Sequence, residues 1–203
     1  MSELVKCNGI VLAEHPYGEY DKMLTVLTAE NGKITVSAKG AKRTTGRFLA
    51  CSQIFCYSTM QLFRGRSEIY TLNDASLINS FYGLRSDLDR LLAASRIAKL
   101  TTQVAQSEFG DDALMRLLLN TLHFLSKGER DTGLLECIFK IRMVSDQGFF
   151  DDGEYREKGT ESAVLHICTS PMEKLFSFKV SEEVLAELRE ISDISIKRMF
   201  EAL

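Results

Sequence analysis

Several features that would mark a specific class of protein are scarce in this sequence or missing from it. The 203 residues include two prolines and no tryptophan. The five cysteines never form a C-x-x-C pair; they are Cys7, Cys51, Cys56, Cys137 and Cys168. An odd, scattered set argues against a disulfide framework and favours reduced thiols that pack as small apolar side chains.

Long apolar segments are also missing. No run approaches the roughly 18 apolar residues that a membrane span needs. The first residues, MSELVKCNGIVLAEH, lack the basic start and the long apolar stretch of a secretory signal peptide. We therefore expect a cytoplasmic protein.

Motifs of phosphate-binding and metal-dependent enzymes are missing as well. No two glycines are separated by a single residue, and the chain has no G-K-[ST], H-E-x-x-H or G-x-S-x-G segment. His15 and His123 lie far from His166, which with Cys168 would supply only two ligands for a metal ion. We expect no catalytic residue, no metal site and no cofactor.

Charge is distributed unevenly along the chain. Residues 1–72 hold nine Lys/Arg and six Asp/Glu, a balance of +3, and residues 73–203 hold sixteen and twenty-two, a balance of −6, which together give the net charge of −3. This asymmetry predicts two units with different partners.

The first unit has the pattern of short β-strands. Ile34, Val36 and Ala38 alternate with polar residues, and Asn31-Gly32 before them is typical of a tight hairpin turn. Similar short runs occupy residues 5–14, 21–30, 58–65 and 67–73. Five strands in about seventy residues favour a small closed barrel, because closure removes exposed strand edges.

From residue 84 the apolar period changes to that of helices. Residues 86–106, 111–128 and 131–148 each open on a Ser or Asp that can cap a helix, and a further helix is expected from Ser181. The segment 149–180 is predicted to be an acidic loop followed by one or two short strands, AVLHI and KLFSF. The fold class is therefore α+β, a barrel followed by a helical unit.

A cluster of basic residues follows the predicted hairpin. Lys33, Lys39, Lys42, Arg43 and Arg47 fall within fifteen residues that contain no acid. A solvated face is the ordinary interpretation of such a run. A positive groove with nearby aromatic rings is, however, what single-stranded nucleic acid needs. The cations available on this unit are Lys33, Lys39, Lys42, Arg43, Arg47, Arg64 and Arg66, and the aromatic residues are Tyr20, Phe48, Tyr57, Phe63 and Tyr70.

These residues also carry a family resemblance. The runs YDKMLTVLTAENGKITVSAKGAKRTTGRF and IYTLNDASLINSFYGLRSDLDRLLAASRIAKLT resemble the RecO family of bacterial recombinational repair proteins. The family pattern is T-x-x-x-G-[KR], then A-K-G-A-[KR]-[KR], then a small residue followed by Arg. The matching residues here are Thr28, Gly32, Lys33, Ala38, Lys39, Gly40, Ala41, Lys42, Arg43 and Arg47. The resemblance is specific over residues 1–100 and poor over the last fifty.

The resemblance implies an OB-fold over residues 1–80 and a helical domain over 81–203. It implies a non-enzymatic mediator that binds single- and double-stranded DNA and anneals complementary strands. Such a protein would work with RecR and the single-strand binding protein SSB to load RecA, and it would be cytoplasmic and associated with the nucleoid. The basic residues above would bind the phosphates.

Two further expectations come from the family. Many members carry two C-x-x-C pairs that form a zinc finger, whereas this chain has only Cys168 in that region, so 149–180 is expected to be a degenerate, metal-free finger. The acidic, Phe-ended tail of SSB would need an apolar pocket rimmed by cations in the helical domain. The candidates for it are Phe139, Lys140 and Arg142, and the RecR contact is expected on the barrel.

Two other functions stay open from the sequence. The barrel could serve as a protein-interaction adaptor whose cations meet acidic partners, with DNA contact incidental. An enzyme acting on nucleic acid has less support, because neither clustered acids nor histidines lie near the basic residues.

Overall fold

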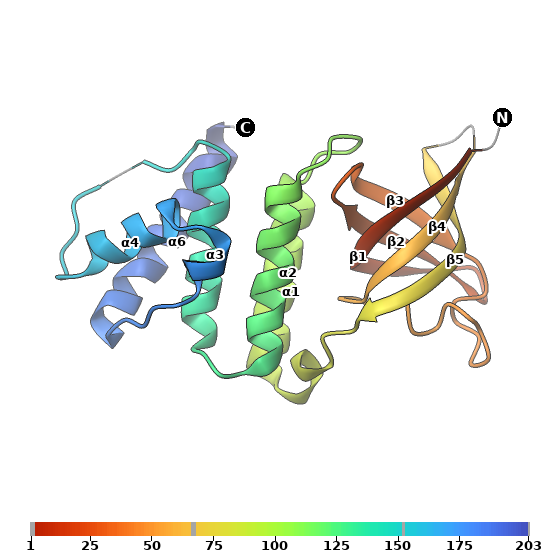
Figure 1. Cartoon of the computed structure of the whole chain (residues 1–203), viewed down its shortest axis with the longest axis horizontal. Helices are drawn as coiled ribbons and strands as arrows, with labels where there is room; N and C mark the ends of the chain where they lie inside the picture. Colours follow the sequence, from red (N-terminus) through yellow and green to blue (C-terminus); the bar gives the residue numbers. More distant parts are fainter. Residues whose placement is uncertain (1–2, 66–67, 152, 203) are drawn as a thin grey trace. The chain divides into compact units, whose positions relative to one another are not determined.

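The computed structural model describes residues 3–65, 68–151 and 153–202. The chain divides into two compact units (Figure 1). The first, here the barrel unit, contains the residues up to Tyr82 together with Ala98–Arg116. The second, the helical unit, contains Gly83–Ile97 and the residues from Leu117 onward.

The barrel unit is built on five strands, β1 (Glu3–Tyr17), β2 (Asp21–Thr28), β3 (Gly32–Ala38), β4 (Tyr57–Arg64) and β5 (Ile69–Asn79). They close in the order β1-β2-β3-β5-β4, with β1 pairing β4 and with β3 and β5 running parallel. Every strand therefore has a partner on both sides, and no open edge remains between them. The predicted closed barrel of OB type is confirmed.

The alternation along the strands explains the core of the barrel. Ile34, Val36 and Ala38 of β3 are buried, while Thr35 between them is exposed. The same inward positions recur on the neighbouring strands, and the buried cluster also takes in Phe48 from the loop after β3. Burying apolar side chains inside the barrel stabilises the fold by about 25 cal/mol for each Å² of apolar surface removed from water.

The β2–β3 connection differs in detail from the predicted tight turn. It spans three residues between paired Thr28 and Gly32, and of its Asn-Gly pair only Gly32 has positive φ, at 60°. The Thr28 hydroxyl accepts a hydrogen bond from the Asn31 N–H at 3.1 Å and donates one to the Gly32 carbonyl at 3.2 Å. A three-residue loop followed by a glycine with positive φ closes a hairpin as well as a two-residue turn does.

The helices of the chain are η1 (Tyr82–Ser86), α1 (Leu88–Val104), α2 (Asp112–Lys127), α3 (Thr132–Asp146), α4 (Thr160–Thr169), α5 (Met172–Leu175) and α6 (Glu182–Ala202). The four helices predicted from the 3.6-residue period are confirmed as α1, α2, α3 and α6. Two predicted caps are confirmed, since Asp111 accepts a hydrogen bond from the Leu114 N–H at 2.9 Å and Asp131 accepts one from the Leu134 N–H at 2.8 Å. The cap predicted at Ser86 is wrong: Asp87 accepts the hydrogen bond from the Arg90 N–H at 3.0 Å, and the Ser86 hydroxyl donates to the Gly83 carbonyl.

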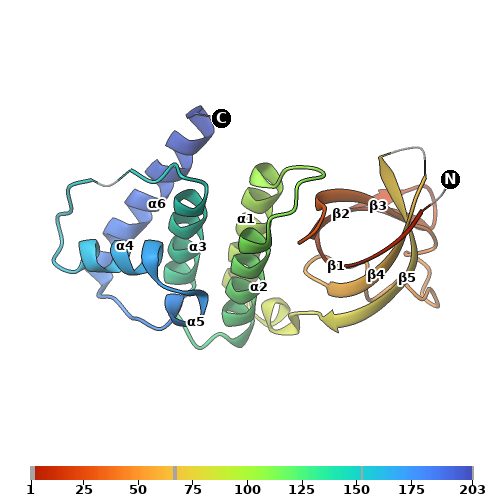
Figure 2. The same cartoon turned by 45° about the horizontal axis from the view of Figure 1, so that its top comes forward.

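The strands predicted within 149–180 are wrong. AVLHI lies in α4, and KLFSF begins at the end of α5 and continues without regular structure. Ala163, Val164 and Ile167 are buried, which is the spacing of one helix face. A five-residue apolar run fits a strand and a helix equally well, and packing against α3 and α6 decides here for the helix (Figure 2).

The segment before α4 is anchored by a buried carboxylate. Glu187 of α6 accepts hydrogen bonds from the backbone N–H groups of Arg156 at 2.6 Å and Glu157 at 2.9 Å, and from the Thr160 hydroxyl at 2.7 Å. Burial alone would raise the pKa of Glu187, but these hydrogen bonds lower it to about 2. Because Glu187 fixes two backbone groups and a side chain, it anchors residues 156–160 to α6.

The residues present do not fit a zinc finger. Within the described ranges no three His, Cys, Asp or Glu residues lie together in a way that could hold a metal ion. His166 has Nε2 at 3.0 Å from the Lys174 carbonyl oxygen, and Glu187 already receives three hydrogen bonds. In addition, no described helix is both long and apolar enough to cross a membrane.

Candidate nucleic-acid interface

The candidate site is the loop that follows β3. Residues 39–47, here called the basic loop, are fixed to the turn between β1 and β2. Asp21 accepts a hydrogen bond from the Gly40 N–H at 2.7 Å, and the Lys42 N–H donates to the Tyr20 carbonyl at 2.9 Å. Because two connections brace each other, the basic loop has a defined position on the barrel.

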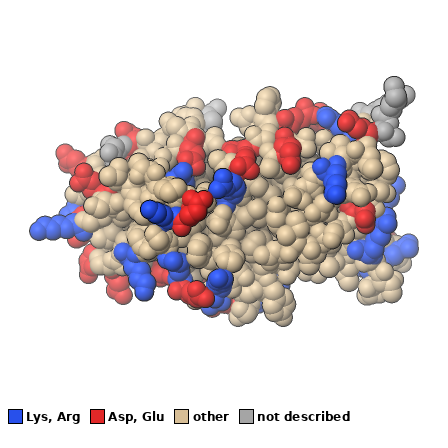
Figure 3. All heavy atoms as spheres, viewed as in Figure 1, with Lys and Arg blue, Asp and Glu red and all other residues tan. Residues whose placement is uncertain are grey.

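Four cations project from the basic loop. Lys39, Lys42, Arg43 and Arg47 are exposed, and none of them forms a salt bridge in the described part of the chain. In Figure 3, Lys and Arg atoms gather at the end of the barrel where this loop lies. The segment that braces the basic loop carries two acids, Glu19 before β2 and Asp21 at its first position.

Aromatic rings hold the two arginines in place. The Arg43 guanidinium lies 4.8 Å from the centroid of the Tyr20 ring, and that of Arg47 lies 4.5 Å from the Phe48 ring. Stacking through its flat face leaves a guanidinium able to donate hydrogen bonds from its edge, where a phosphate binds in the bidentate manner. These contacts give each guanidinium an aromatic neighbour that carries no charge.

The other predicted cations are placed elsewhere. Lys33 is the second residue of β3. It lies at the opposite end of the strand from the basic loop, about 20 Å away at about 3.3 Å per residue. The Lys33 ammonium donates to the Thr102 carbonyl at 2.7 Å and lines a cavity of about 410 Å³ with Glu68 and Glu108. Arg64 forms an ion pair of 2.5 Å with Glu108. Arg66 lies outside the described residues.

The predicted aromatic residues divide into core and surface. Phe48 and Tyr70 are buried in the barrel, and Tyr57 is half-buried. Tyr20 and Phe63 are exposed, but only Tyr20 adjoins the basic loop. Sequence reasoning missed Tyr17, whose side chain is 62% exposed at the end of β1. Its place directly before Gly18 in a hairpin connection was the available clue.

Two family models match the chain. The model described as Recombination protein O N terminal matches residues 1–81, and the one described as Recombination protein O C terminal matches residues 85–154. The chain belongs to the RecO family. The resemblance on which the sequence interpretation rested is therefore confirmed.

Curated relatives agree with this membership. The DNA repair protein RecO of Acetivibrio thermocellus is 32% identical over 232 aligned residues, which cover 97% of this chain and 92% of its own. That of Caldicellulosiruptor saccharolyticus is 34% identical over 194 residues, covering 96% and 76%. The Bacillus subtilis protein of the same name is 34% identical over 149 residues, covering 73% and 58%.

The three residues predicted for a partner peptide on this RecO chain serve internal contacts. Phe139 is fully buried. Lys140 forms ion pairs with Asp193 at 2.8 Å and Glu136 at 3.1 Å. Burial alone would lower the pKa of Lys140, but these two carboxylates raise it. The three side chains thus do not form an open pocket.

Arg142 is likewise occupied. It pairs with Asp146 at 2.8 Å and donates hydrogen bonds to the carbonyls of Ile167 at 3.1 Å and Ser170 at 2.7 Å. The guanidinium therefore fastens α3 to the end of α4. Sequence alone showed a basic residue on a helix but not the carbonyl groups that it meets.

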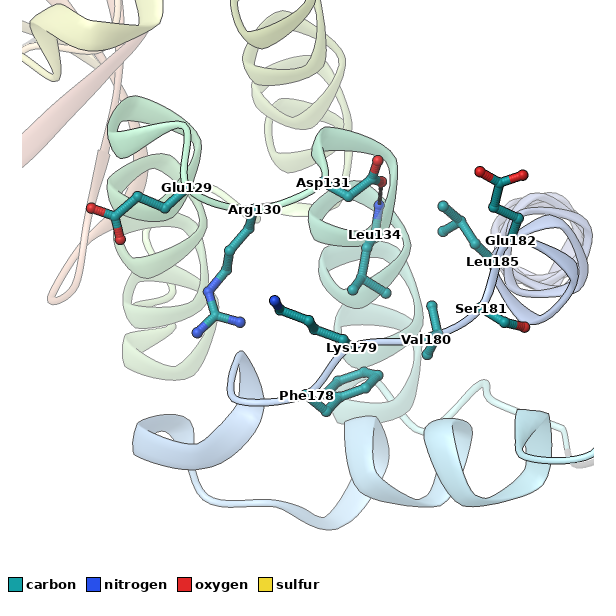
Figure 4. A pocket seen from close by; sticks show the side chains of 10 residues that line it. All are labelled: Glu129, Arg130, Asp131, Leu134, Phe178, Lys179, Val180, Ser181, Glu182 and Leu185. Carbon is teal, nitrogen blue, oxygen red and sulfur yellow. Dashed lines mark hydrogen bonds between the residues drawn. The ribbon is translucent and has the colours of Figure 1, made fainter.

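A cavity of about 300 Å³ in the helical unit combines an apolar lining with charged side chains of both signs (Figure 4). Its apolar lining comes from Leu134, Phe178, Val180 and Leu185. The Arg130 and Lys179 side chains point toward one another across it, although Glu129, Asp131 and Glu182 also belong to the lining. The Arg130 guanidinium also lies 5.0 Å from the centroid of the Phe124 ring. Two cations that face each other over an apolar surface suit a ligand with both an anionic and an apolar group.

Proposed function

We propose that this RecO-family protein acts in DNA repair and recombination by binding DNA through the basic loop. Membership of the family supports the repair role. The observation that carries the DNA-binding proposal is the braced basic loop, whose four exposed cations have no acid partner in the described salt bridges. Phosphate contacts of this kind bind a strand without reading its sequence.

The proposed mechanism is exchange and pairing of strands rather than chemical turnover. Cations that bind phosphates reduce the repulsion between two strands, so complementary strands held on this surface can anneal. The same contacts are available from single- and double-stranded DNA, because both present phosphates. In the proposed pathway the protein works with RecR, whose contact we place on the barrel, and helps to transfer SSB-covered DNA to RecA.

The SSB tail is proposed to bind the cavity of Figure 4 rather than Phe139, Lys140 and Arg142. An acidic peptide ending in Phe would place its carboxylates between Arg130 and Lys179 and its ring on the apolar lining. Binding of a labelled peptide of this composition tests the assignment. Lys179→Glu should weaken binding, whereas Lys174→Glu, which changes an exposed lysine of α5 outside the cavity, should not.

The salt dependence of DNA binding tests the main proposal. Four phosphate contacts on a single strand predict a slope of log K against log salt of about −2.8, or about 50-fold weaker binding after a fourfold increase in salt. Fluorescence anisotropy with a labelled oligomer measures both quantities. The double variant Lys39→Glu, Arg43→Glu should bind more weakly at every salt concentration and reduce the slope by about 1.4.

The matched control is Lys6→Glu with Lys99→Glu. Both residues are exposed, both belong to the barrel unit, and the change in net charge is the same. If the control weakened binding as much as the basic-loop variant, the effect would come from net charge and not from this loop. If neither variant changed binding, partners retained after nuclease treatment at high salt would instead favour the adaptor function.

A further inference from the structure

Two tyrosine rings beside the basic loop are exposed to solvent. Tyr17 ends β1 with 62% of its side chain exposed, and Tyr20 directly precedes β2 with 44% exposed. The other aromatic residue at the basic loop, Phe48, is buried in the barrel core. Large rings left in water forgo the stabilisation that burial would give, so their surface is available to a flat apolar ligand.

The connection between β1 and β2, which carries both tyrosines, contacts the cations of the basic loop. Lys42 contacts the β1–β2 turn twice, through its N–H to the Tyr20 carbonyl at 2.9 Å and through its ammonium to the Gly18 carbonyl at 3.4 Å. Arg43 stacks on Tyr20 at 4.8 Å. A strand whose phosphates lie on the basic loop therefore has its bases within reach of the turn.

We propose that Tyr17 and Tyr20 form a stacking platform for unpaired bases, so that this end of the barrel prefers single-stranded to double-stranded nucleic acid. The inference rests on the proposed function, since it needs phosphates on the basic loop. In a duplex the base faces are covered by neighbouring bases, whereas in a single strand they can stack on an aromatic ring. Stacking strengthens binding about 5- to 150-fold per base, the equivalent of roughly 1–3 kcal/mol.

The two tyrosines differ in what their removal tests. Tyr20 also supports Arg43, so Tyr20→Ala should weaken the binding of any nucleic acid in addition to removing a stacking surface. Tyr17 stacks with no cation in the described part of the chain. Tyr17→Ala is therefore the sharper test of base recognition.

The experiment compares three labelled probes with the full chain at one salt concentration. They are a thymidine oligomer of about 16 nucleotides, the upper end of an OB-fold site, an abasic strand of the same length and a duplex of the same length. Wild-type protein should bind the thymidine oligomer at least about fivefold more tightly than the abasic strand. Tyr17→Ala should reduce that difference by the contribution of one stacked base, about fivefold or more, and leave the affinity for the abasic strand and the duplex within about twofold.

Matched variants separate the ring from other effects. Tyr17→Phe keeps the aromatic face and should behave as wild type, and Tyr17→Leu keeps apolar bulk alone and should behave as Tyr17→Ala. Tyr82→Ala, which removes a 76% exposed tyrosine of η1, should change none of the three affinities.

The outcomes distinguish the two proposals. If Lys39→Glu with Arg43→Glu weakens binding of all three probes while Tyr17→Ala and Tyr20→Ala leave the preference for the thymidine oligomer unchanged, the stacking platform is wrong and the basic loop stands. If the charge reversal changes no affinity, the proposed function itself is wrong. Both proposals are supported if the charge reversal weakens the binding of all three probes and the tyrosine substitutions reduce the preference for the thymidine oligomer.

Discussion

Replacing Glu187 should show how strongly this carboxylate anchors the segment before α4. Glu187→Ala removes the acceptor for the N–H groups of Arg156 and Glu157 and for the Thr160 hydroxyl. Glu187 also lies 3.5 Å from the Arg156 side chain. All these partners belong to residues 156–160, so one substitution removes four contacts of the segment and leaves the exposed Arg156–Glu190 ion pair.

The expected magnitude follows from the groups left without a partner. A hydrogen bond to a charged group contributes about 1.5–3 kcal/mol, and each buried polar group left unsatisfied costs about 1–3 kcal/mol. Water can reach part of the released loop, which reduces the sum, so we expect a loss of about 3 kcal/mol. Urea unfolding followed by circular dichroism should show a midpoint about 1.5 M lower, for a slope of about 2 kcal/mol per M.

Glu190→Gln is the matched control. Glu190 lies on the same helix and pairs with the same residue, Arg156, at 2.5 Å, but it is largely exposed. Exposed ion pairs contribute at most about 1 kcal/mol, so the midpoint should move little. Trypsin adds a local readout, since Arg156 and Lys158 lie in the anchored segment and should be cut faster in Glu187→Ala alone. Equal unfolding and equal cleavage in the two variants would refute the anchoring role.

Three further outcomes are expected. Because the pKa of Glu187 falls from an ordinary 4.5 to about 2 on folding, its contribution is present above pH 4.5 and lost between pH 4.5 and 2; acid titration of stability should be flatter in Glu187→Gln. Gly32→Ala places a methyl group against the Phe109 carbonyl at positive φ and should cost more than about 1 kcal/mol, measured by thermal unfolding. Burial raises the pKa of Cys7 and Cys137 to about 11, so a thiol reagent at pH 8 should modify neither before denaturation.

Most of the architecture could be predicted because local pattern and final packing agree. The alternation of Ile34, Val36 and Ala38 places a strand, and Asp131 marks the start of a helix that does begin there. The strand prediction for AVLHI failed because a run of five residues carries too little periodicity to distinguish a strand from a helix. Only α3 and α6, which are far away in sequence, supply the face on which Val164 and Ile167 pack as a helix.

The candidate site could be predicted only in part, because side-chain partners distant in sequence decide which charges stay free. Lys140 is a free cation in sequence, but Asp193 of α6 and Glu136 of its own helix neutralise it. Tyr17 was missed for a related reason: whether its side chain is exposed depends on whether a distant part of the chain packs over it. A turn residue gives little indication of this before the fold is known.

Charge balance along the sequence is therefore a poor measure of the charge that a ligand meets. Residues 1–72 carry a balance of +3, yet Arg64 within them pairs with Glu108 from the connection between α1 and α2, and Lys22 pairs with Glu14 at 2.8 Å. The basic loop is different, because its arginines stack on aromatic rings instead of pairing with acids. A ring orients a guanidinium without neutralising it, so the positive charge stays available for phosphate. The aromatic residues near the loop thus differ in what they contact: the rings of Phe48 and Tyr20 each lie under an arginine, whereas Tyr17 stacks with no cation in the described part of the chain.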